Sequence, residues 1–290
     1  MKKLSVDLFF LHTFLIKLSF CRRLNCWYAF PIILLISMMP DARAQDLDVP
    51  FVPTSENVVK LMLDVVNVGP GDYVIDLGSG DGRIVIAAAK RGATGHGIDI
   101  DPRRIKEARD NAVREGVDKK VLFIQDDLFK TDFSRASVVT MYLLNSVNLK
   151  LRPHLLKNLR PGTRIVSHDF DMDDWKPDKY LKEGYSDVYY WVIPAKADGN
   201  WKWNTGGTDF TMNVKQNYQE ITVSVTSAKT VFQTEESVLS GERISFTALH
   251  PSNGSKYVFS GRIDGKSITG TVQVRVGDNA EIKKWDASLN

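Results

Sequence analysis

The stretch Tyr73-Val-Ile-Asp-Leu-Gly-Ser-Gly-Asp-Gly82 decides the fold of this chain. It begins with five mostly apolar residues that suit a strand, and it continues into a turn with glycines at 78, 80 and 82. Glycine lets the backbone turn tightly and approach a ligand that any Cβ would keep away. The residues from 83 to 91 contain three consecutive alanines, which favour a helix. The stretch therefore predicts a strand, a glycine turn and a helix in immediate succession.

The same alternation of strand and helix extends on both sides of this stretch. A helix with Thr54 or Ser55 as its cap precedes it, and the turn Gly69-Pro-Gly-Asp72 ends that helix. Further strands are predicted at 95–98, 121–124, 137–142 and 163–167, and a further helix at 103–115. Strands separated by helices indicate an α/β fold with a doubly wound, Rossmann-like parallel sheet.

The glycine turn differs from a dinucleotide-binding turn in its sixth residue and in its charge. The sixth position is Arg83 rather than glycine, and Asp76 and Asp81 flank the turn. These acids would repel a pyrophosphate and attract a cationic or zwitterionic ligand. S-adenosylmethionine carries a sulfonium and an ammonium group, so it suits this turn. The structural alternative is an ordinary strand-to-helix turn without a ligand.

Acidic residues also follow the next two strands. Asp99 ends the second strand 23 residues after Asp76, a spacing typical of the acid that binds ribose hydroxyls in doubly wound nucleotide folds. Asp101 is predicted to cap the next helix. Asp126 and Asp127 close the third strand, where Asp127 can accept a hydrogen bond from an adenine amino group. Because the carboxyl ends of parallel strands share one edge, these acids are predicted to meet at one crevice.

These motifs resemble those of the seven-strand S-adenosylmethionine-dependent methyltransferases. Within that class, the chain is most similar to the mitochondrial lysine methyltransferases that modify the ATP-synthase c-subunit and the adenine nucleotide carrier, and to their bacterial relatives. The resemblance covers about residues 50–195. It rests on Phe51-Val-Pro-Thr54, Asp76-Leu-Gly-Ser-Gly-Asp-Gly-Arg-Ile-Val85, Asp127-Leu128, Tyr142-Leu-Leu144 and Trp175-Lys-Pro177.

The resemblance implies S-adenosyl-L-methionine as cofactor and a set of residues that bind it. Asp76, Gly78 and Gly80 would contact its methionine part, Asp99 its ribose and Asp127 its adenine. Together with two neighbours from the same motifs, the predicted cofactor-binding residues are Asp76, Gly78, Ser79, Gly80, Asp99, Asp127 and Leu128. The chain departs from the mitochondrial members in two respects: they have no C-terminal β-rich module, and they carry a different acidic residue at the position of Asp99.

The methyl acceptor is marked less clearly than the cofactor. After the fourth strand the chain reads Tyr142-Leu-Leu-Asn145, without the Asn/Asp-Pro-Pro-aromatic motif of many methyltransferases that modify nucleic acids or glutamine. This argues against a nucleic-acid partner, and the resemblance implies a protein lysine as acceptor. A lysine amine needs alignment with the sulfonium methyl, which a narrow apolar channel can provide. The sequence assigns no catalytic residue and no metal ligand.

One cluster near the fifth strand has two interpretations. It consists of His168, Asp169, Asp171, Asp173 and Asp174. The cluster could attract a basic substrate, with His168 as a base. The interpretation that the residue pattern favours is a capped loop with solvated carboxylates.

The pattern changes beyond residue 195. Alternating, β-branched segments at 210–214, 221–225, 243–246, 256–259 and 267–274 predict strands, and Asn253-Gly254 and Asp264-Gly265 are hairpin turn signals. Residues 196–290 are therefore predicted to form a small antiparallel all-β module, a barrel or a sandwich. Its predicted core residues are Trp201, Trp203, Tyr218, Phe246, Tyr257, Phe259 and Trp285. The alternative is that these aromatic residues form a surface for carbohydrate or peptide, and the module could bind a partner.

Residues 1–44 are predicted to be a signal peptide. A basic start, an apolar run over 29–39 and the triplet Ala42-Arg-Ala44 indicate cleavage before Gln45. The apolar run is too short for a comfortable membrane span. Both cysteines of the chain lie in this segment, so the mature chain has no thiol, which suits an oxidising compartment. Residues 45–195 are then an exported, periplasmic methyltransferase domain; a membrane-anchored chain is the alternative.

Charge and motifs together define the functional hypotheses. Residues 45–290 contain 32 basic and 33 acidic side chains, so they lack the excess of positive charge that nucleic-acid binding requires. The leading hypothesis is a protein-lysine N-methyltransferase. The two alternatives are an exported binding protein that keeps the methyltransferase scaffold without turnover, and a methyltransferase of small molecules.

Overall fold

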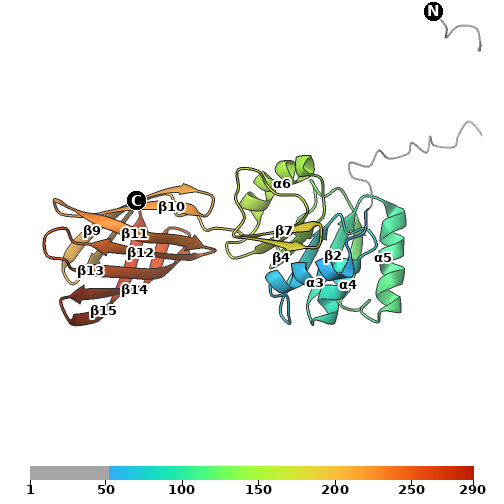
Figure 1. Ribbon diagram of the computed structural model, residues 1–290, viewed down its shortest axis with the longest axis horizontal. Helices are drawn as coiled ribbons and strands as arrows, with labels where there is room; N and C mark the ends of the chain where they lie inside the picture. The colour runs from blue at the N-terminus through green and yellow to red at the C-terminus, as the bar shows by residue number, and fades with distance from the viewer. Residues whose placement is uncertain (1–51) are drawn as a thin grey trace, which may run out of the picture. The chain divides into compact units, whose positions relative to one another are not determined.

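The computed structural model describes residues 52–290, which form an α/β part and a β-barrel (Figure 1). The predicted signal peptide, 1–44, lies outside the described residues, as does the segment 45–51. Over 52–290, no helix is long and apolar enough to cross a membrane. Within the same range, no group of three or more His, Cys, Asp or Glu side chains could hold a metal ion.

The α/β part contains a seven-strand sheet in the order β3-β2-β1-β4-β5-β7-β6. Strands β1 to β5 pair in parallel, whereas β7 is antiparallel to both of its neighbours. The predicted doubly wound fold is confirmed. The elements are α3 (Glu56–Val65), β1 (Tyr73–Leu77), α4 (Arg83–Lys90), β2 (Thr94–Asp99), α5 (Pro102–Arg114), β3 (Val121–Gln125), β4 (Val138–Met141), α6 (Asn145–Asn158), β5 (Arg164–His168), β6 (Lys179–Glu183) and β7 (Ser186–Val192).

The sheet of the α/β part has an apolar core on each face. Adjacent residues of a strand point to opposite faces, so Val74 of β1 packs in a cluster with residues of α3 and α4, while Ile75 packs with residues of α6. Val138 and Val139 of β4 divide in the same way between these two clusters. Both faces of the central strands are therefore buried, which explains their continuous apolar sequences.

Two helices begin at residues that act as side-chain caps. Ser55 caps α3, because its Oγ accepts a hydrogen bond from the amide of Val58, 3.4 Å away. Asp101 caps α5 as predicted, and its Oδ1 accepts a hydrogen bond from the amide of Arg103 at 2.8 Å. Thr54, the other predicted cap of α3, instead places its Oγ1 at 3.1 Å from the Nδ1 of His168. The residues directly before α3 are thereby joined to the end of β5.

Several elements had no clear signal in the sequence. Helix α6 contains Pro153 and is polar on most of its surface, but Val147, Leu151 and Leu155, four residues apart, bury one side of it. Strands β6 and β7 form the antiparallel end of the sheet, and β6 is an exposed edge strand with the sequence Lys-Tyr-Leu-Lys-Glu. Charged residues suit such an edge because they discourage pairing with other chains. They also remove the alternation by which a strand is predicted.

The C-terminal residues form a closed antiparallel barrel of eight strands. Of the two predicted forms of the β module, barrel and sandwich, the structure shows the barrel. Each strand pairs with the next in the sequence, and β15 closes the barrel against β8. The turn at Asp264-Gly265 joins β13 to β14 as predicted. The strands are β8 (Gly199–Thr205), β9 (Thr208–Asn217), β10 (Glu220–Ser227), β11 (Thr230–Ser240), β12 (Arg243–Leu249), β13 (Lys256–Asp264), β14 (Ser267–Val276) and β15 (Asn279–Leu289).

Aromatic side chains fill the barrel. Trp203, Phe246, Phe259 and Trp285 are each 5% exposed or less, and the centroids of their neighbouring rings lie 4.6–6.0 Å apart. The prediction that these aromatic residues are core is confirmed. It was wrong for Tyr218, which occupies the β9–β10 turn with a φ of 54° and packs against the core of the α/β part. A turn residue does not follow the in-and-out alternation of a strand.

The β9–β10 turn holds the loop that follows β5. The ring of Tyr218 stacks on Trp175, with 5.6 Å between centroids, and its hydroxyl donates to the Oδ2 of Asp174 at 3.0 Å. Gln219 accepts a hydrogen bond from the indole N–H of Trp175 at 2.8 Å and donates one to the carbonyl of Lys176 at 2.7 Å. Residues 174–176 are therefore fixed by side chains of the barrel.

Candidate active site

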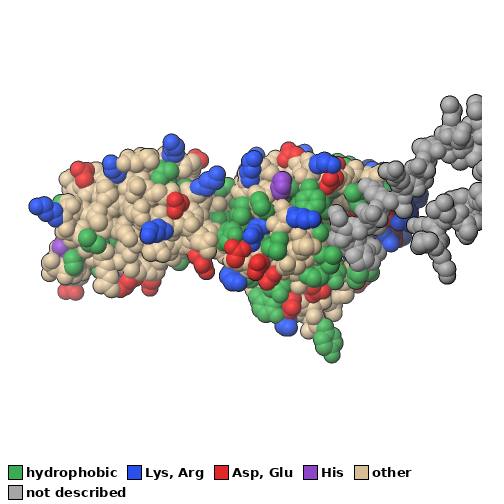
Figure 2. Space-filling model, turned by 90° about the horizontal axis from the view of Figure 1, so that it is seen from above, with side chains coloured by type: hydrophobic (Ala, Val, Ile, Leu, Met, Phe, Trp, Pro, Cys, Tyr) green, Lys and Arg blue, Asp and Glu red, His purple; other side chains and the backbone are tan. Residues whose placement is uncertain are grey.

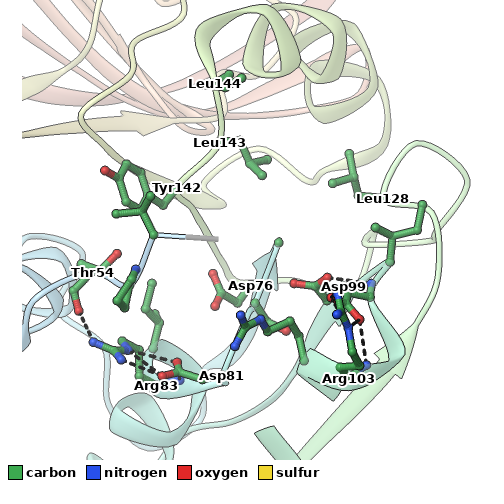
Figure 3. Close-up of a pocket in the computed structure, with 18 of the residues that line it drawn as sticks. Thr54, Asp76, Asp81, Arg83, Asp99, Arg103, Leu128, Tyr142, Leu143 and Leu144 are labelled. Carbon is green, nitrogen blue, oxygen red and sulfur yellow. Dashed lines mark hydrogen bonds and ion pairs between the residues drawn. The ribbon is translucent and has the colours of Figure 1, made fainter. Parts of the chain in front are cut away.

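A cavity of about 390 Å³ lies where β1, β2 and β4 end (Figure 3). The strand order reverses between β1 and β4, and ligands of doubly wound folds bind at such a point. In Figure 3 the carboxylate of Asp76 lies between Asp99 on one side and Tyr142 on the other. The predicted cofactor-binding residues that line the cavity are Asp76, Gly78, Ser79, Asp99, Asp127 and Leu128.

Asp76 is a buried carboxylate with few partners. It is 2% exposed, and the hydroxyl of Thr140 donates to its Oδ1 at 2.6 Å. Burial raises the pKa of Asp76 to about 7; Thr140 opposes this rise, and the charges of Asp99 and Asp81 add to it. A cation placed beside this carboxylate would relieve the cost of its charge. The site therefore suits an ammonium group.

Asp99 is held in a fixed orientation by the turn itself. Its Oδ2 accepts a hydrogen bond from the amide of Gly80 at 2.8 Å, and its Oδ1 accepts one from the amide of Asp101 at 2.9 Å. Gly80 does not belong to the lining of the cavity, so its visible contribution is to orient Asp99. The direct contact of Gly80 with a cofactor stays a prediction.

Gly78 occupies a position where a side chain would collide with another part of the protein; its predicted close approach to a ligand stays a prediction. Its φ is 78°, and a Cβ at this position would come within 2.7 Å of the Cδ2 of Leu143. Leu143 follows β4 and also lines the cavity. The next residue, Ser79, has a buried hydroxyl without a hydrogen-bond partner among residues 52–290. That hydroxyl faces Gly97 of β2, where an added Cβ would lie 2.5 Å from its oxygen.

Arg83 changes the role that the sequence suggested for Asp81. Its guanidinium donates to both carboxylate oxygens of Asp81, at 2.6–3.1 Å, and to the carbonyl of Thr54 at 2.7 Å. The pairing with Arg83 reduces the attraction of Asp81 for a cationic ligand, although the charge of Asp81 still acts on Asp76. Asp76 and Asp99 contribute most of the negative field in the cavity, while Arg83 joins the segment before α3 to the glycine turn.

Asp127 and its neighbours form the wall opposite the segment before α3. Asp127 accepts a hydrogen bond from the amide of Phe129 at 2.9 Å and pairs with Lys130 at 3.0 Å. These two interactions lower the pKa of Asp127. Leu128 and Phe129 add apolar surface. The wall combines a flat apolar surface with a hydrogen-bond acceptor, which suits an adenine ring.

The acidic cluster after β5 divides into residues with different partners. His168 is 4% exposed, and its two ring nitrogens lie 3.1 Å from the Oγ1 of Thr54 and 3.0 Å from the Oγ of Ser186. Asp171 accepts a hydrogen bond from Asn145 at 3.1 Å. Asp174 pairs with Arg152. His168, Asp171 and Asp174 therefore hold the loop together. The favoured interpretation expected carboxylates with water as their partner, whereas those of Asp171 and Asp174 have partners in the protein.

The cavity also contains residues that the sequence did not predict as part of the site. Arg83, Phe129 and Phe170 line it. Phe129 directly follows Asp127-Leu128, so its neighbourhood in the sequence was a usable signal. Phe170 follows β5, and only the pairing of β4 with β5 brings it beside Tyr142.

The residues of the cavity fit S-adenosylmethionine. The buried carboxylate of Asp76 suits its cationic methionine part, the oriented carboxylate of Asp99 suits ribose hydroxyls, and the wall at Leu128 suits adenine. A seven-strand sheet in this order, with a glycine turn and an acid at the end of β2, defines a methyltransferase that depends on this cofactor.

Comparisons with known proteins agree with this class. Residues 76–179 match the family of the ANTKMT methyltransferase domain. The chain is 46% identical over 151 residues to a protein-lysine N-methyltransferase of Saccharolobus islandicus (strain REY15A), and the match covers 50% of this chain and 94% of that protein. It is 35% identical over 148 residues to the lysine N-methyltransferase of the ATP synthase c-subunit from Homo sapiens, and this match covers 51% of this chain and 62% of the human protein.

A solved structure places the chain in the same class of S-adenosylmethionine-dependent methyltransferases. The RNA methyltransferase from Salinibacter ruber, in complex with S-adenosyl-L-homocysteine, is 54% identical to this chain with a TM-score of 0.50, and the match covers 50% of this chain and 95% of that one. The chain therefore belongs to the family of S-adenosylmethionine-dependent methyltransferases with the ANTKMT methyltransferase domain. Its cofactor is S-adenosyl-L-methionine.

Proposed function

We propose that this enzyme transfers a methyl group from S-adenosylmethionine to the side-chain nitrogen of a lysine in a protein. The observation that carries the proposal is the 46% identity with a protein-lysine N-methyltransferase over 94% of that relative. The cavity supports it, because Tyr142, Leu144 and Phe170 give part of its lining an apolar and aromatic character. Such a lining fits the methylene chain of a lysine.

The reaction requires little from the protein besides alignment and exclusion of water. S-adenosylmethionine supplies an electrophilic methyl group: the N–C bond forms as the C–S bond breaks, S-adenosylhomocysteine leaves, and the amine proton passes to water. Within this scheme Asp76 and Asp99 hold the donor at one side of the cavity. The residues around Tyr142 hold the acceptor at the other side. Alignment of two bound reactants accounts for a large part of the barrier in such transfers.

RNA is a second candidate acceptor, because the Salinibacter structure that is 54% identical to this chain is described as an RNA methyltransferase. Three observations weigh against it. Residues 142–145 lack the Asn/Asp-Pro-Pro-aromatic motif, and residues 45–290 carry no net positive charge. On the face shown in Figure 2, basic and acidic side chains are interspersed and form no large basic area. RNA binding depends on such an area.

We also propose that the enzyme is exported through residues 1–44 and works in the periplasm of a bacterium. The support is the basic start, the apolar run and the Ala42-Arg-Ala44 triplet, together with the absence of cysteine after residue 26. Anchoring through the same segment is the alternative. A reporter fused after residue 60 tests both, since retention of the reporter in the cytoplasm would contradict export.

The acceptor is tested by methyl transfer from labelled S-adenosylmethionine to a lysine-rich protein mixture and, separately, to total RNA. We expect label in protein and, after acid hydrolysis, in methylated lysine. Asp99→Ala is the control, since it removes the carboxylate that the turn orients beside the cofactor. Label in RNA alone would favour the second candidate. If the folded protein neither bound the cofactor nor transferred label, the assignment of a working donor site would be wrong.

A further inference from the structure

One carboxylate after β5 differs from its neighbours in what surrounds it. Tyr142 follows β4 and Asp169 follows β5, and these strands are parallel neighbours, so their carboxyl ends meet. The hydroxyl of Tyr142 donates to the Oδ2 of Asp169 at 3.2 Å. The Tyr142 ring is also roughly stacked with the ring of Phe170, with 6.2 Å between centroids and 27° between planes. Tyr142 and Phe170 both line the cavity, whereas Asp169 adjoins it through its hydrogen bond with Tyr142 and is not among the lining residues.

The backbone holds Asp169 in place at some cost. Its φ is 59°, a left-handed conformation that costs a non-glycine residue about 1 kcal/mol or more. Two hydrogen bonds with Asp187 maintain it: the amide of Asp169 donates to the carbonyl of Asp187 at 2.7 Å, and the Oδ1 of Asp169 accepts from the amide of Asp187 at 2.9 Å. The strained conformation places the second carboxylate oxygen, Oδ2, beside Tyr142.

The charge of Asp169 is not compensated by a strong cation. Among the ion pairs of residues 52–290, Asp169 takes part only in one with His168, at 3.3 Å. Burial lowers the pKa of His168 below its usual 6.5, although Asp169 acts in the opposite direction, so the imidazole is neutral at pH 7. Asp174, by contrast, pairs with the cation of Arg152, while Asp171 accepts a hydrogen bond from the neutral amide of Asn145. The Asp169 side chain is 31% exposed and remains able to attract a cation.

We propose that Tyr142, Asp169 and Phe170 form the amine-binding site of this enzyme, which selects a primary ammonium group on an unbranched alkyl chain. The imidazole of His168 covers one face of the Tyr142 ring, with 3.9 Å between centroids, so the methylenes and the cation pack against the remaining surface of the two rings, and the carboxylate supplies the opposite charge. A neutral amide or a base amino group can donate a hydrogen bond to this carboxylate but gains no charge–charge attraction from it. This inference rests on the proposed transfer to lysine and identifies the residues that recognise the acceptor.

The test uses two peptides that are identical except for one lysine, which is replaced by norleucine in the second. Their binding to the full chain is measured by calorimetry in the presence of S-adenosylhomocysteine. We expect the wild type to prefer the lysine peptide and this preference to weaken as salt increases. Equal binding of the two peptides by the wild type would overturn the proposal.

Asp169→Asn is the decisive variant, because asparagine tolerates the left-handed conformation and its Oδ1 can still accept from Asp187. We expect about tenfold weaker binding of the lysine peptide, within the range of charge-assisted hydrogen bonds, a smaller dependence on salt, and an unchanged dissociation constant for S-adenosylmethionine. Tyr142→Phe, which keeps the ring, should have a smaller effect than Tyr142→Ala. Asp173→Asn is the matched control, since Asp173 has the same φ of 59° in the same loop.

The possible failures can be separated from each other. If Asp169→Asn bound and methylated the lysine peptide as the wild type does, the amine-binding site would be wrong while the proposed function would stand. If Asp173→Asn weakened the binding as much as Asp169→Asn, the effect would be a general one of acidic charge, and the specific site would be wrong. If the wild type bound S-adenosylmethionine but methylated RNA alone, the proposed function itself would fail.

Discussion

Replacing Asp76 by asparagine is expected to stabilise the cofactor-free protein while it removes cofactor binding. Burial raises the pKa of Asp76 from 3.8 to about 7 in the folded state. Between these two pH values the folded chain keeps a proton that the unfolded chain has released, so stability falls as the pH rises. Above pH 7 the folded protein contains a buried charge with Thr140 as its hydrogen-bond donor. Asparagine has the same shape without that charge.

The expected change in stability follows from the pKa shift of Asp76. A rise from 3.8 to about 7 corresponds to about 4 kcal/mol at about 1.4 kcal/mol per pH unit, and this is the full cost of the charge above pH 7. From pH 5 to pH 8 the destabilisation caused by the Asp76 carboxylate increases by about 3 kcal/mol. The amide of asparagine has its own unpaired N–H groups, which cost about 1–3 kcal/mol at every pH. The dependence on pH therefore isolates the carboxylate.

The assay is urea unfolding of the cofactor-free wild type and Asp76→Asn at pH 5 and pH 8. The difference in unfolding free energy, variant minus wild type, should be more positive at pH 8 by about 3 kcal/mol. Calorimetry with S-adenosylmethionine is expected to show binding to the wild type that weakens about tenfold per pH unit below pH 7, because protonated Asp76 no longer attracts the ammonium group. The variant should not bind with measurable affinity.

One outcome would refute the reasoning about Asp76. If the variant differed from the wild type by the same free energy at pH 5 and at pH 8, the pKa of Asp76 would be ordinary and burial would not have raised it. Thr140→Val is an independent control. It removes the hydroxyl that stabilises the charged form, so it should lower the stability of the cofactor-free protein more at pH 8 than at pH 5.

Three further predictions concern the glycine turn and the barrel. Gly78→Ala should abolish cofactor binding and lower the melting temperature, because the residue has a positive φ and a methyl group would come within 2.7 Å of a leucine side chain. Gln219→Ala leaves the buried indole N–H of Trp175 without its partner. We expect the free energy of unfolding in urea to fall by about 1–3 kcal/mol. The KM for the acceptor should rise, while the affinity for the cofactor stays unchanged. Trp201→Phe should destabilise the barrel more than Trp203→Phe, because the indole N–H of Trp201 donates to a carbonyl at 2.8 Å whereas that of Trp203 has no partner among residues 52–290; equal losses in thermal unfolding would contradict this.

Much of the fold could be predicted because its signals are local. The strand before the glycine turn, the alanine-rich helix after it and the acids at the strand ends are each visible in ten residues or fewer. The expected strands at 95–98, 121–124, 137–142 and 163–167 coincide with β2 to β5 to within two residues. Helix α6 and strands β6 and β7 had no such signal, since their stability depends on what covers them. An element of this kind is determined by its neighbours rather than by its own pattern.

The same division applies to the site. The sequence by itself determined the doubly wound fold, the edge of the sheet at which the cavity lies and the chemical type of the cofactor, because glycines and carboxylates at strand ends express these properties directly. Only the tertiary structure decided that Arg83 pairs with Asp81 and that burial raises the pKa of Asp76. It also decided that Tyr142 and Asp169, 27 residues apart, meet beside the cavity. Charge compensation and burial depend on distances between segments that are remote in the sequence, and folding alone sets those distances.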